Sequence, residues 1–521
     1  MDVGILNRKI VEDKKGGQLL LDLSNDFKIR IYRDSLNESD GCTFLIGREG
    51  FVKSLYLISV GEVSPLFRKF EGEIVESSGS GDKLRIMRCG MTHSNALRLQ
   101  ELFPFTRATA VGLTNSFGFG DRLGLANAGH LRALKGYRFK PILAQQSIRE
   151  LTRTNRTPED VMDAAVWAVF QEGYKDGFGA DADHLKRTDD IDRLIKAGFR
   201  TFTFDPSDFV VNGVEELSLD EVKRKVALLP WKDLQDNVQV LLSRYEKKTF
   251  KISDGFSIAP AGEEIFRAAL KYCAALVHIR NLYSHLKKNY SDIKYEVEVS
   301  IDETDTITSP FEHFFIVTEL KRLGVIFVSL APRFIGDFEK GIDYKGDLGL
   351  FRREYEKHAN ISVHFGDYKI SLHSGSDKLS AYKEIGKLNV GLIHIKTAGT
   401  SYLEALKVVA NKNYSLFREI LDFSVGLYAD EKKSYHVSAD VKKLKRGKEY
   451  RDDELAGLFN SNDVRQILHV TYGRVLTEKN KEGNFLFRDR IYKCLIENEE
   501  LHYRILFDHF RKHLEPFRNL A

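Results

Sequence analysis

The sequence predicts an α/β protein built on a (β/α)8 barrel of the TIM type. From about residue 107 onward, short apolar runs alternate with segments of helical period, and eight such units follow one another up to about residue 412. Polar side chains gather directly after nearly every apolar run. Active sites of such barrels lie at the carboxyl ends of the strands, so this placement fits the same fold. A chain of 521 residues can also hold further domains beside the barrel.

The first 106 residues predict a β-rich N-terminal segment. Residues 27–32, 42–46 and 54–58 are short alternating or apolar runs between turn residues, as in strands. Residues 77–82 are rich in Ser and Gly, which favours a hairpin tip or a flexible loop. Nothing in this pattern points to chemistry, so we expect the segment to pack on the main domain or to form an interface.

The first four barrel strands are predicted before residue 205. The first apolar run is followed by the glycine-rich residues 115–122, and the second ends in Gln145, Gln146 and Ser147. A helix is predicted over 160–172, because a Thr-Pro pair precedes a segment with an apolar face. The four strands are expected at 109–114, 140–144, 178–186 and 201–204.

A long interruption separates the fourth strand from the fifth. Residues from about 208 to 290 are mostly helical in pattern, and they are too many for one strand-to-strand connection. We therefore expect a helical insertion that lies over the face bearing the strand ends. The remaining strands are expected at 295–301, 325–330, 369–372 and 391–395.

The residues after the eighth unit predict a helical C-terminal extension. They are charged and of helical period, for example over 489–509, which is why we set them outside the barrel. The expected organisation is a β-rich segment at 1–106, a barrel at 107–412 and the extension at 413–521. A contact within a homo-oligomer is one expected role of this extension.

Composition narrows the class of protein. The hydrophobic fraction is 42%, the charged fraction is 30% and the net charge is +4, all ordinary for a soluble globular protein. Because charge is balanced, we expect no nucleic-acid partner. The four cysteines lie far apart without CxxC spacing, which favours a reducing cytoplasm over a disulfide framework or a zinc ribbon. We see no secretory signal and no apolar run of membrane-spanning length, so we expect no membrane partner.

The richest chemistry lies in the third strand, residues 178–186. Asp181 and Asp183 are two positions apart, so their side chains share one face of an extended strand. His184 follows where the strand should end. A carboxylate beside an imidazole suits a proton shuttle or a metal site. The alternative is an ordinary strand end whose aspartate caps the next helix.

The fifth strand carries a second acidic pattern. Glu296, Glu298, Ser300 and Asp302 alternate with apolar residues, so all four face one side, which we take to be the barrel interior. A buried carboxylate without a partner is costly, and inward acids therefore imply a cation or a functional proton. The alternative is an edge strand with one wet face, which a closed barrel does not have.

Three further residues are candidate metal ligands. His373 follows the seventh strand and precedes a Ser-Gly-Ser loop that suits an anion or a helix start. His394 lies within the eighth strand, and either histidine can equally be structural. Asp343 lies in the long sixth loop, where it can reach a metal or simply stabilise a turn.

Other side chains at the strand ends suit a sugar acid. Arg333 and Lys396 are cations of the kind that binds a carboxylate, although each can also be a solvated or ion-paired loop residue. Gln145, Gln146 and Ser116 can form hydrogen bonds with hydroxyl groups. Residues 116–124 contain GxGxxxG instead of GxGxxG, so they do not indicate a dinucleotide site.

Several of these strings together resemble the tagaturonate epimerase family (tagaturonate/fructuronate epimerase). The resemblance covers about residues 107–412 and is looser outside them. The strings that carry it are SFGFGDRLG at 116–124, QQSIRELTRT at 145–154, FGADADHLK at 178–186, LHSGSD at 372–377 and HIKTAGTSYL at 394–403.

The resemblance implies a divalent-metal enzyme that interconverts D-tagaturonate and D-fructuronate in uronate catabolism. It implies that Asp183 is the base and that His184 and His373 bind the metal; Glu298 would be the acid. The third metal ligand is open between Asp343 and His394, and we expect Gln146, Arg333 and Lys396 to bind substrate. Zn, Mn, Co and Ni all suit a mixed site of this kind.

The implied reaction inverts a carbinol carbon that is β to the ketone, so simple enolisation cannot epimerise it. One route is retro-aldol cleavage, in which Asp183 takes the carbinol proton and Glu298 returns a proton after the bond re-forms, with the metal as Lewis acid. The alternatives are a metal-dependent aldolase or isomerase of another sugar acid and, from another class, a non-catalytic sugar-acid sensor. Product analysis separates the enzymes, and a sensor would not need Asp183 for its signal.

Overall fold

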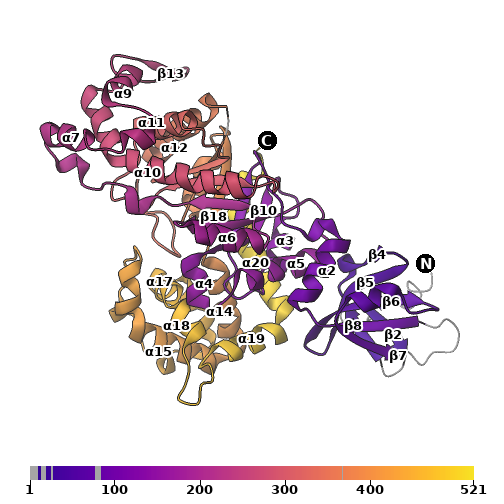
Figure 1. Cartoon of the computed structure of the whole chain (residues 1–521). Helices are drawn as coiled ribbons and strands as arrows, with labels where there is room; N and C mark the ends of the chain where they lie inside the picture. The colour runs from indigo at the N-terminus through magenta and orange to yellow at the C-terminus, as the bar shows by residue number, and fades with distance from the viewer. Residues whose placement is uncertain (1–9, 13–18, 25–26, 77–83, 367, 521) are drawn as a thin grey trace.

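The computed structural model describes residues 10–12, 19–24, 27–76, 84–366 and 368–520. Figure 1 shows an elongated molecule with the N-terminal sheet at one end, the barrel in the middle and the helices α7 to α9 at the other end. The helices α15 to α19 lie together beside the barrel (Figure 1). Among the described residues, no helix is both long enough and apolar enough to cross a bilayer.

The N-terminal segment is an antiparallel sheet in the order β1-β2-β3-β5-β6-β8-β7, with β4 paired to β5. This confirms the prediction of a β-rich segment. Apolar side chains of β5 and β6 face the main core, and α2 (His93–Leu102) leads into the barrel. The hairpin tip expected at 77–82 lies outside the described residues. The strands are β1 (Ile10–Glu12), β2 (Leu19–Ser24), β3 (Phe27–Ile31), β4 (Asn37–Ser39), β5 (Cys42–Glu49), β6 (Val52–Val60), β7 (Gly72–Glu76) and β8 (Leu84–Cys89).

Eight parallel strands close into a barrel in the order β10-β11-β12-β15-β16-β17-β18-β9. The predicted (β/α)8 barrel is confirmed. Because the strands are parallel, their carboxyl ends meet at one end of the barrel, which gathers the polar residues of distant segments. The strands are β9 (Ser116–Phe119), β10 (Lys140–Ser147), β11 (Gly179–Leu185), β12 (Thr201–Phe204), β15 (Glu296–Ile301), β16 (Ser329–Pro332), β17 (Lys369–Leu372) and β18 (Leu392–Thr397).

The position predicted for the first barrel strand is wrong. Residues 109–114 are not a strand; they contact the amino ends of β15 and β17, where the Gly112 N–H donates to Glu296 at 2.7 Å and Lys369 donates to the Gly112 carbonyl at 3.0 Å. The true first strand, β9, lies within the glycine-rich stretch. A Cβ at Gly118 would lie 1.8 Å from Gln145 Oε1, so only glycine fits between the neighbouring strands there.

Of the other barrel strands, β10 and β16 differ most in extent from the prediction. β10 continues to Ser147, so Gln145 and Gln146 lie within a strand and point to opposite sides. β16 begins at Ser329, later than the expected residue 325. The predicted helix over 160–172 is α5 (Pro158–Gln171), and Thr157 caps it by accepting the Asp160 N–H at 3.1 Å.

Helices surround the barrel strands and carry much of its core. A short helix, α4 (Ile148–Thr154), follows β10 directly, with a capping box between Ser147 and Glu150. The larger ones are α3 (Asn127–Leu134), α6 (Thr188–Lys196), α10 (Gly262–Asn289), α11 (Pro310–Arg322), α12 (Leu348–His364), α13 (Leu379–Gly386) and α14 (Thr400–Lys412).

The insertion after β12 contains α7 (Leu219–Val226), α8 (Trp231–Leu234), α9 (Val238–Tyr245) and the hairpin of β13 (Phe250–Ser253) and β14 (Phe256–Ile258). Its last helix, α10, packs between α6 and α11 and so takes the helix position between β12 and β15. The rest projects away from the barrel (Figure 1). We expected this insertion over the strand ends, but none of residues 208–290 lines the cavity there. Other segments of the chain line this end of the barrel instead.

The C-terminal residues form a second helical core with α14. This core joins Leu406 and Val409 of α14 to Leu421 and Leu468 of the following helices. The helices are α15 (Tyr414–Glu431), α16 (Asp452–Leu455), α17 (Asn462–Val470), α18 (Tyr472–Thr477), α19 (Arg488–Glu497) and α20 (Glu499–Leu514).

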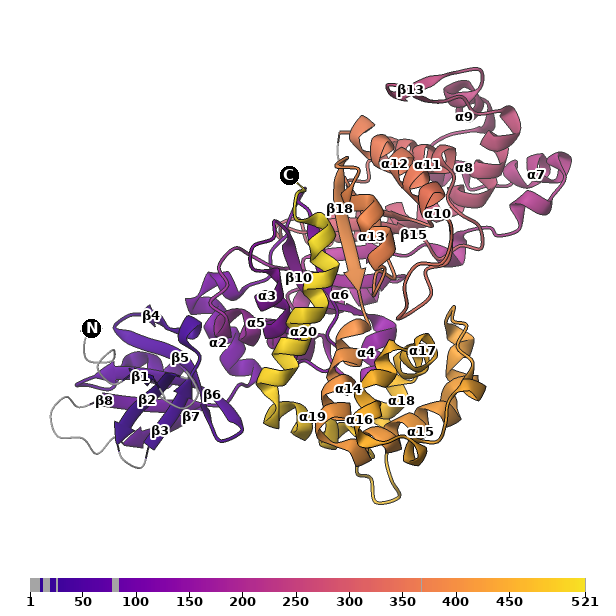
Figure 2. The ribbon, with the colours of Figure 1, turned by 180° about the vertical axis from the view of Figure 1, so that it is seen from behind.

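The last helix, α20, returns to the barrel wall. Figure 2 shows it running across the barrel beside α3. Phe510 packs against Phe117 and Phe119 of β9, with ring centroids 6.2 and 5.1 Å apart. The contact with α3 is so close that a Cβ at Gly129 would lie 2.8 Å from Leu506 Cδ1. The C-terminal residues thus supply part of the helix layer around the barrel.

Candidate active site

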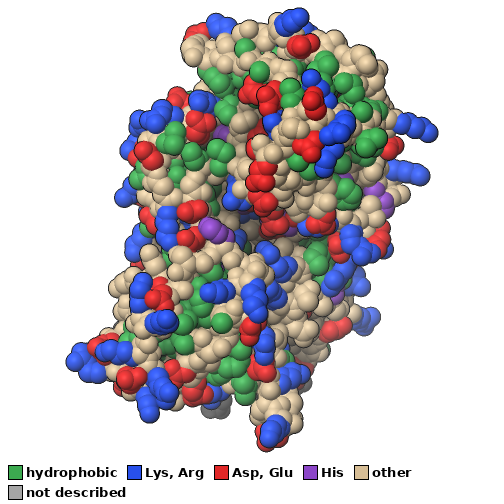
Figure 3. Space-filling model, turned by 90° about the vertical axis from the view of Figure 1, so that its left-hand side faces the viewer, with side chains coloured by type: hydrophobic (Ala, Val, Ile, Leu, Met, Phe, Trp, Pro, Cys, Tyr) green, Lys and Arg blue, Asp and Glu red, His purple; other side chains and the backbone are tan. Residues whose placement is uncertain are grey.

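A cavity of about 260 Å³ opens at the carboxyl ends of the barrel strands. This is close to the lower end of the roughly 300–1,000 Å³ range of small-molecule sites. The face seen in Figure 3 is hollowed near its middle, with acidic side chains above the hollow and basic side chains below it. Residues that line the cavity include Gln145, Asp183, His184, Asp302, His373 and Lys396.

His184 is held at the end of β11 with one ring nitrogen facing the cavity. Its backbone lies in the left-handed region with φ +53°, an uncommon conformation for histidine. Its Nδ1 lies 3.3 Å from Asp205, which follows β12 and also accepts the Ser207 N–H at 2.9 Å. A carboxylate that holds one nitrogen of an imidazole orients the other for a ligand. His184 Nε2 is that free nitrogen, 3.8 Å from Asp183 Oδ1.

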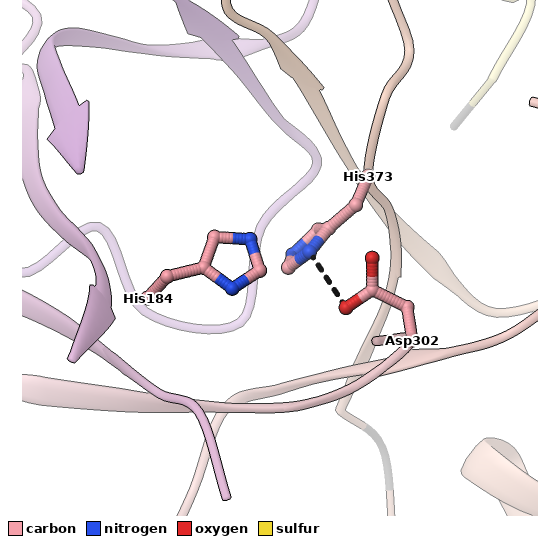
Figure 4. A group of neighbouring side chains, drawn as sticks. All are labelled: His184, Asp302 and His373. Carbon is pink, nitrogen blue, oxygen red and sulfur yellow. Dashed lines mark ion pairs between the residues drawn. The ribbon is translucent and has the colours of Figure 1, made fainter. Parts of the chain in front are cut away.

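His373 faces His184 across the cavity, and Asp302 lies beside it (Figure 4). The two rings have centroids 5.0 Å apart. His373 Nε2 donates to Glu298 at 2.7 Å, which leaves Nδ1 toward Asp302. That Nδ1 is buried and makes no hydrogen bond of good geometry, although an Asp302 oxygen lies 3.1 Å away.

The group of His184, Asp302 and His373 fits a divalent metal. One ligand atom from each residue lies within 4.8 Å of the other two. Two imidazole nitrogens and one carboxylate oxygen are a donor set that suits transition metals. The Nδ1 of His373 makes no hydrogen bond of good geometry among the described residues, so it is the atom that such an ion would satisfy. Glu298 and Asp205 occupy the other nitrogens and fix the orientation of both rings.

Lys396 of β18 lies next to this group of residues and is surrounded by carboxylates. Its Nζ contacts Asp181 at 2.7 Å, Asp183 at 2.8 Å and Glu298 at 2.7 Å. It also donates to Thr203 Oγ1 at 2.6 Å. Burial opposes the charge, but the three carboxylates raise the pKa of Lys396 well above its ordinary value. The lysine is therefore an ammonium ion at neutral pH.

The same cluster sets the charge of the acidic residues. Burial raises the pKa of Asp183, but Lys396 and the two histidines outweigh it, so the pKa lies below its ordinary value. The pKa of Glu298 is lowered in the same way: burial raises it, but Lys396 and His373 outweigh burial and hold it well below the ordinary value. Burial raises the pKa of Asp181 to about 6. Asp183 and Glu298 are thus carboxylates in this state, and Asp183 has the charge that a base needs.

Neither expected candidate for the third metal ligand joins this group. Asp343 does not line the cavity; its carboxylate accepts the backbone N–H and the hydroxyl of Ser380 at 3.1 and 2.9 Å and so holds the start of α13. His394 lies deeper, with Nδ1 2.9 Å from Ser116 Oγ. Burial lowers the pKa of His394 to about 3, so it is neutral. Asp302 instead has a carboxylate oxygen within 4.8 Å of a nitrogen of each ring.

The three residues expected to bind substrate lie in different settings. Gln146 points away from the cavity and donates to the Asp121 carbonyl at 3.2 Å. Its neighbour Gln145 lines the cavity, and both of its amide atoms lack a hydrogen-bond partner in the structure. Lys396 lines the cavity but is neutralised by carboxylates. Arg333 lines the cavity and donates to the Thr304 carbonyl.

The sequence analysis did not find part of this site. Asp302 had a signal, because the alternation in the fifth strand turned it inward, but it was not assigned as a ligand. Lys340 lines the cavity from a loop and Arg149 from the first turn of α4, and no sequence pattern had pointed to either. The C-terminal residues Tyr435 and His469 also line it, although they follow the barrel in sequence.

Known proteins match this chain over nearly its whole length. The sequence profile of UxaE, described as tagaturonate epimerase, matches residues 32–517. The chain belongs to the tagaturonate epimerase family. A tagaturonate/fructuronate epimerase of Thermotoga maritima is 42% identical over 485 residues, which are 93% of this chain and 96% of that protein.

Solved structures of the same family share the fold. The native fructuronate-tagaturonate epimerase UxaE of Cohnella laeviribosi is 38% identical with a TM-score of 0.85, covering 94% of this chain and 96% of that one. Its complex with two glycerols is 37% identical with a TM-score of 0.86, covering 95% and 97%. The family resemblance seen in the sequence is confirmed, and so is the prediction that the chain is an enzyme of the epimerase class.

Proposed function

We propose that this protein interconverts D-tagaturonate and D-fructuronate with the help of one divalent metal ion. The observation that carries the proposal is the convergence of His184, Asp302 and His373 beside the Asp183 carboxylate. This convergence lies at the active end of the barrel in a member of the tagaturonate epimerase family. The matching proteins of Thermotoga maritima and Cohnella laeviribosi are named for this pair of sugar acids.

His184 Nε2, His373 Nδ1 and one Asp302 oxygen would hold the metal. We assign Asp302 as the third ligand in place of Asp343 or His394, because only Asp302 comes within reach of both rings. The ion supplies Lewis-acid stabilisation of an oxyanion when bound. Zn, Mn, Co and Ni remain the expected metals, since a site of two imidazoles and a carboxylate suits all four.

The carbon to be inverted is C4, which is β to the C2 ketone. We propose that Asp183 takes the proton of the C4 hydroxyl, the C3–C4 bond breaks and its electron pair forms an enediolate at C2 and C3. C4 becomes an aldehyde carbon and turns its other face toward C3. The C3–C4 bond then re-forms with inverted configuration, and the C4 oxygen takes back a proton. The ionised state of Asp183 supports its role as the base.

We propose Glu298 as the residue that returns the proton. In the resting site it accepts hydrogen bonds from His373 at 2.7 Å and from Ser329 at 2.6 Å, and it contacts Lys396 at 2.7 Å. Lys396 also contacts Asp183, so one ammonium joins the proposed base and the proposed acid. Glu298 is unprotonated at rest, and it can act as acid only after the proton taken by Asp183 has been passed on.

The cell compartment and the assembly state are also proposals. We place the reaction in the cytoplasm, because the four cysteines are unpaired and buried, as expected in a reducing compartment. A homo-oligomer remains an expectation from the size of the C-terminal extension. The partner of the site is a small-molecule sugar acid.

The test uses purified protein stripped of metal. It is incubated with D-tagaturonate, with and without Zn, Mn, Co or Ni, and the sugar acids are followed by NMR. We expect D-fructuronate only when metal is added. Conversion at full rate without metal would contradict the metal role, and no conversion with any metal would contradict the function. Release of three-carbon fragments would identify an aldolase, and a moved carbonyl would identify an isomerase.

Carbon isotope effects test the proposed route. Retro-aldol cleavage breaks the C3–C4 bond, so labelling either carbon should slow the reaction by a measurable isotope effect. The same label at C1 serves as a control, because no bond to C1 breaks. Absence of an effect at both C3 and C4 would exclude this route while leaving the epimerase function standing.

A further inference from the structure

Five lysine and arginine side chains and five carboxylates line the cavity, but not all of them are paired with one another. Two of its lining cations are paired: Arg122 contacts Glu150 at 3.0 Å, and Lys396 has its three carboxylates. Lys340 and Arg149 are different. Neither has a carboxylate oxygen within 4.0 Å among the residues that the structure describes.

Lys340 is a half-buried lysine whose only hydrogen bond among the described residues goes to a hydroxyl. Its Nζ donates to Ser374 Oγ at 2.6 Å. Ser374 directly follows His373 and lines the same cavity, so Lys340 is held on the side of the cavity from which His373 comes. Burial lowers the pKa of Lys340, and the nearby charge of Arg149 lowers it further. An ammonium in this place is stabilised when an anion joins it.

Arg149 reaches the same cavity from the first turn of α4. Its guanidinium lies 5.5 Å from the centre of the Tyr435 ring. The charges of Glu303 and Glu150 reach it, but neither residue forms an ion pair with it. A planar guanidinium with free donors is the side chain best suited to grip a carboxylate with two hydrogen bonds.

We propose that Lys340 and Arg149 together form the subsite for the carboxylate of the sugar acid. The inference rests on the proposed function and deepens it. Two cations that repel one another inside one cavity are costly without an anion between them, and a uronate supplies that anion at C6. C6 is two bonds from C4, so a subsite next to Ser374 leaves C4 near the metal group that includes His373.

The sequence had suggested Arg333 and Lys396, and not Lys340 and Arg149, as the cations that bind the carboxylate. The charge of Lys396 is balanced by Asp181, Asp183 and Glu298, and a further anion beside them would be repelled. Arg333 also has no carboxylate oxygen within 4.0 Å among the described residues, but its guanidinium donates to the Thr304 carbonyl. Lys340 and Arg149 are therefore the cations with which the protein distinguishes a uronate from a neutral ketose.

The experiment compares a sugar acid with its neutral counterpart. D-tagatose has a hydroxymethyl group where D-tagaturonate has its carboxylate. Binding of both sugars to metal-loaded protein is measured by calorimetry in an Asp183→Asn background, so that turnover does not interfere. Lys340→Met and Arg149→Met are each compared with the parent, and KM and kcat are measured with Asp183 restored.

We expect each substitution to weaken D-tagaturonate binding by about tenfold to hundredfold, as the loss of a charge-assisted hydrogen bond implies. Binding of D-tagatose should change by less than about threefold, because this sugar makes no use of the positive charge. Lys340→Arg should restore most of the lost affinity. In turnover, KM for D-tagaturonate should rise far more than kcat falls.

Lys345→Met is the matched control. Lys345 lies in the same loop, but it pairs with Glu339 at 2.7 Å and does not line the cavity. Its substitution should leave both affinities within about twofold. Circular dichroism and metal content show that each variant is folded and loaded.

Equal affinity of the parent and both variants for D-tagaturonate would overturn the subsite. So would an equal loss for D-tagatose, since that would indicate a general disturbance of the cavity. The proposed function fails separately, if the parent binds D-tagaturonate without converting it. Because calorimetry does not depend on turnover, the subsite is tested in either case.

Discussion

Asp183 and His184 are neighbours in sequence but have separate proposed tasks. Asp183 is directed toward Lys396, whose charge keeps it ionised, whereas His184 is directed by Asp205 toward the metal group. The left-handed backbone of His184 allows the two side chains to diverge at the strand end. A base and a metal ligand are thereby placed 3.8 Å apart.

We expect Asp183→Asn to abolish turnover and leave the metal bound, because Asn keeps the shape of the side chain but cannot take a proton. His184→Ala should lose both the metal and the turnover, because one of three ligands is removed. Conversion of D-tagaturonate by NMR and metal content by mass spectrometry measure the two effects. Near-parental turnover in Asp183→Asn would show that the base is another residue.

The third ligand can be settled by a pair of matched substitutions. Asp302→Asn should weaken metal affinity by about tenfold or more, because it removes a ligand charge next to His373. Asp343→Asn should keep metal affinity, because Asp343 is bonded to Ser380 outside the cavity. Competition with a metal chelator measures both. The opposite ranking of the two variants would return the assignment to Asp343.

Lys396 is the counter-ion of a buried acidic cluster. Lys396→Met would leave Asp181, Asp183 and Glu298 without their shared cation. Breaking a buried pair from one side costs about 3–5 kcal/mol, so we expect a loss of that size in the free energy of unfolding. Urea unfolding measures it, with Lys345→Met as the exposed control. A loss below about 1 kcal/mol would mean that the cluster takes up protons instead of unfolding the protein.

At the scale of elements, α20 is the part whose role was least expected. It belongs to the C-terminal residues by sequence, yet Phe510 covers β9 and His513 Nε2 accepts the Asp377 N–H at 3.0 Å. Asp377 lies four residues after His373, in the loop that follows β17. The helix therefore supports both the barrel wall and a loop of the active end.

We expect Phe510→Ala to lower the free energy of unfolding by about 3–5 kcal/mol, because it empties a buried site between α20 and β9. Phe507→Ala on the same helix should cost less than about 0.5 kcal/mol, because Phe507 is 37% exposed. Urea unfolding of the two variants gives the comparison. Equal losses would mean that α20 contributes by helix formation and not by packing.

At the scale of the whole molecule, Glu499 joins the N-terminal sheet to α20. It contacts Arg48 at 3.0 Å, and it is also paired with Lys53 and bonded to Tyr503 at 2.7 Å. Burial opposes the charge of Glu499, but its cations outweigh this effect and lower its pKa to about 2. One acidic side chain thus couples two regions that are more than four hundred residues apart in sequence.

This junction should make stability depend on pH in the acid range. The folded pKa of about 2 lies below the ordinary value of 4.5, so the stabilisation is complete above pH 4.5 and is lost as the pH falls toward 2. The shift corresponds to roughly 3 kcal/mol. Urea unfolding from pH 6 to pH 2 measures it. Glu499→Gln should flatten this part of the profile, whereas Glu500→Gln, at an exposed pair, should not.

Much of the architecture could be predicted from the sequence, because its signals are local. Alternation along 295–301 and the polar end of 178–186 identified two strands and turned Asp183, Glu298 and Asp302 inward. The repetition of strand and helix units led to the barrel. The run at 109–114 shows the limit, since it forms no strand although most of its residues are apolar, and its Gly112 backbone instead bonds to Glu296 and Lys369.

The sequence by itself determined the barrel and the family, and it brought forward His184, His373 and Asp183 as candidate site residues, because each of these depends on order along the chain or on one strand face. Only the tertiary structure decided that Asp302 lies beside His184 and His373, that Gln145 and not Gln146 faces the cavity, and that Lys396 is neutralised. These outcomes depend on contacts across the barrel between residues that are far apart in sequence. No local sequence pattern can therefore predict them.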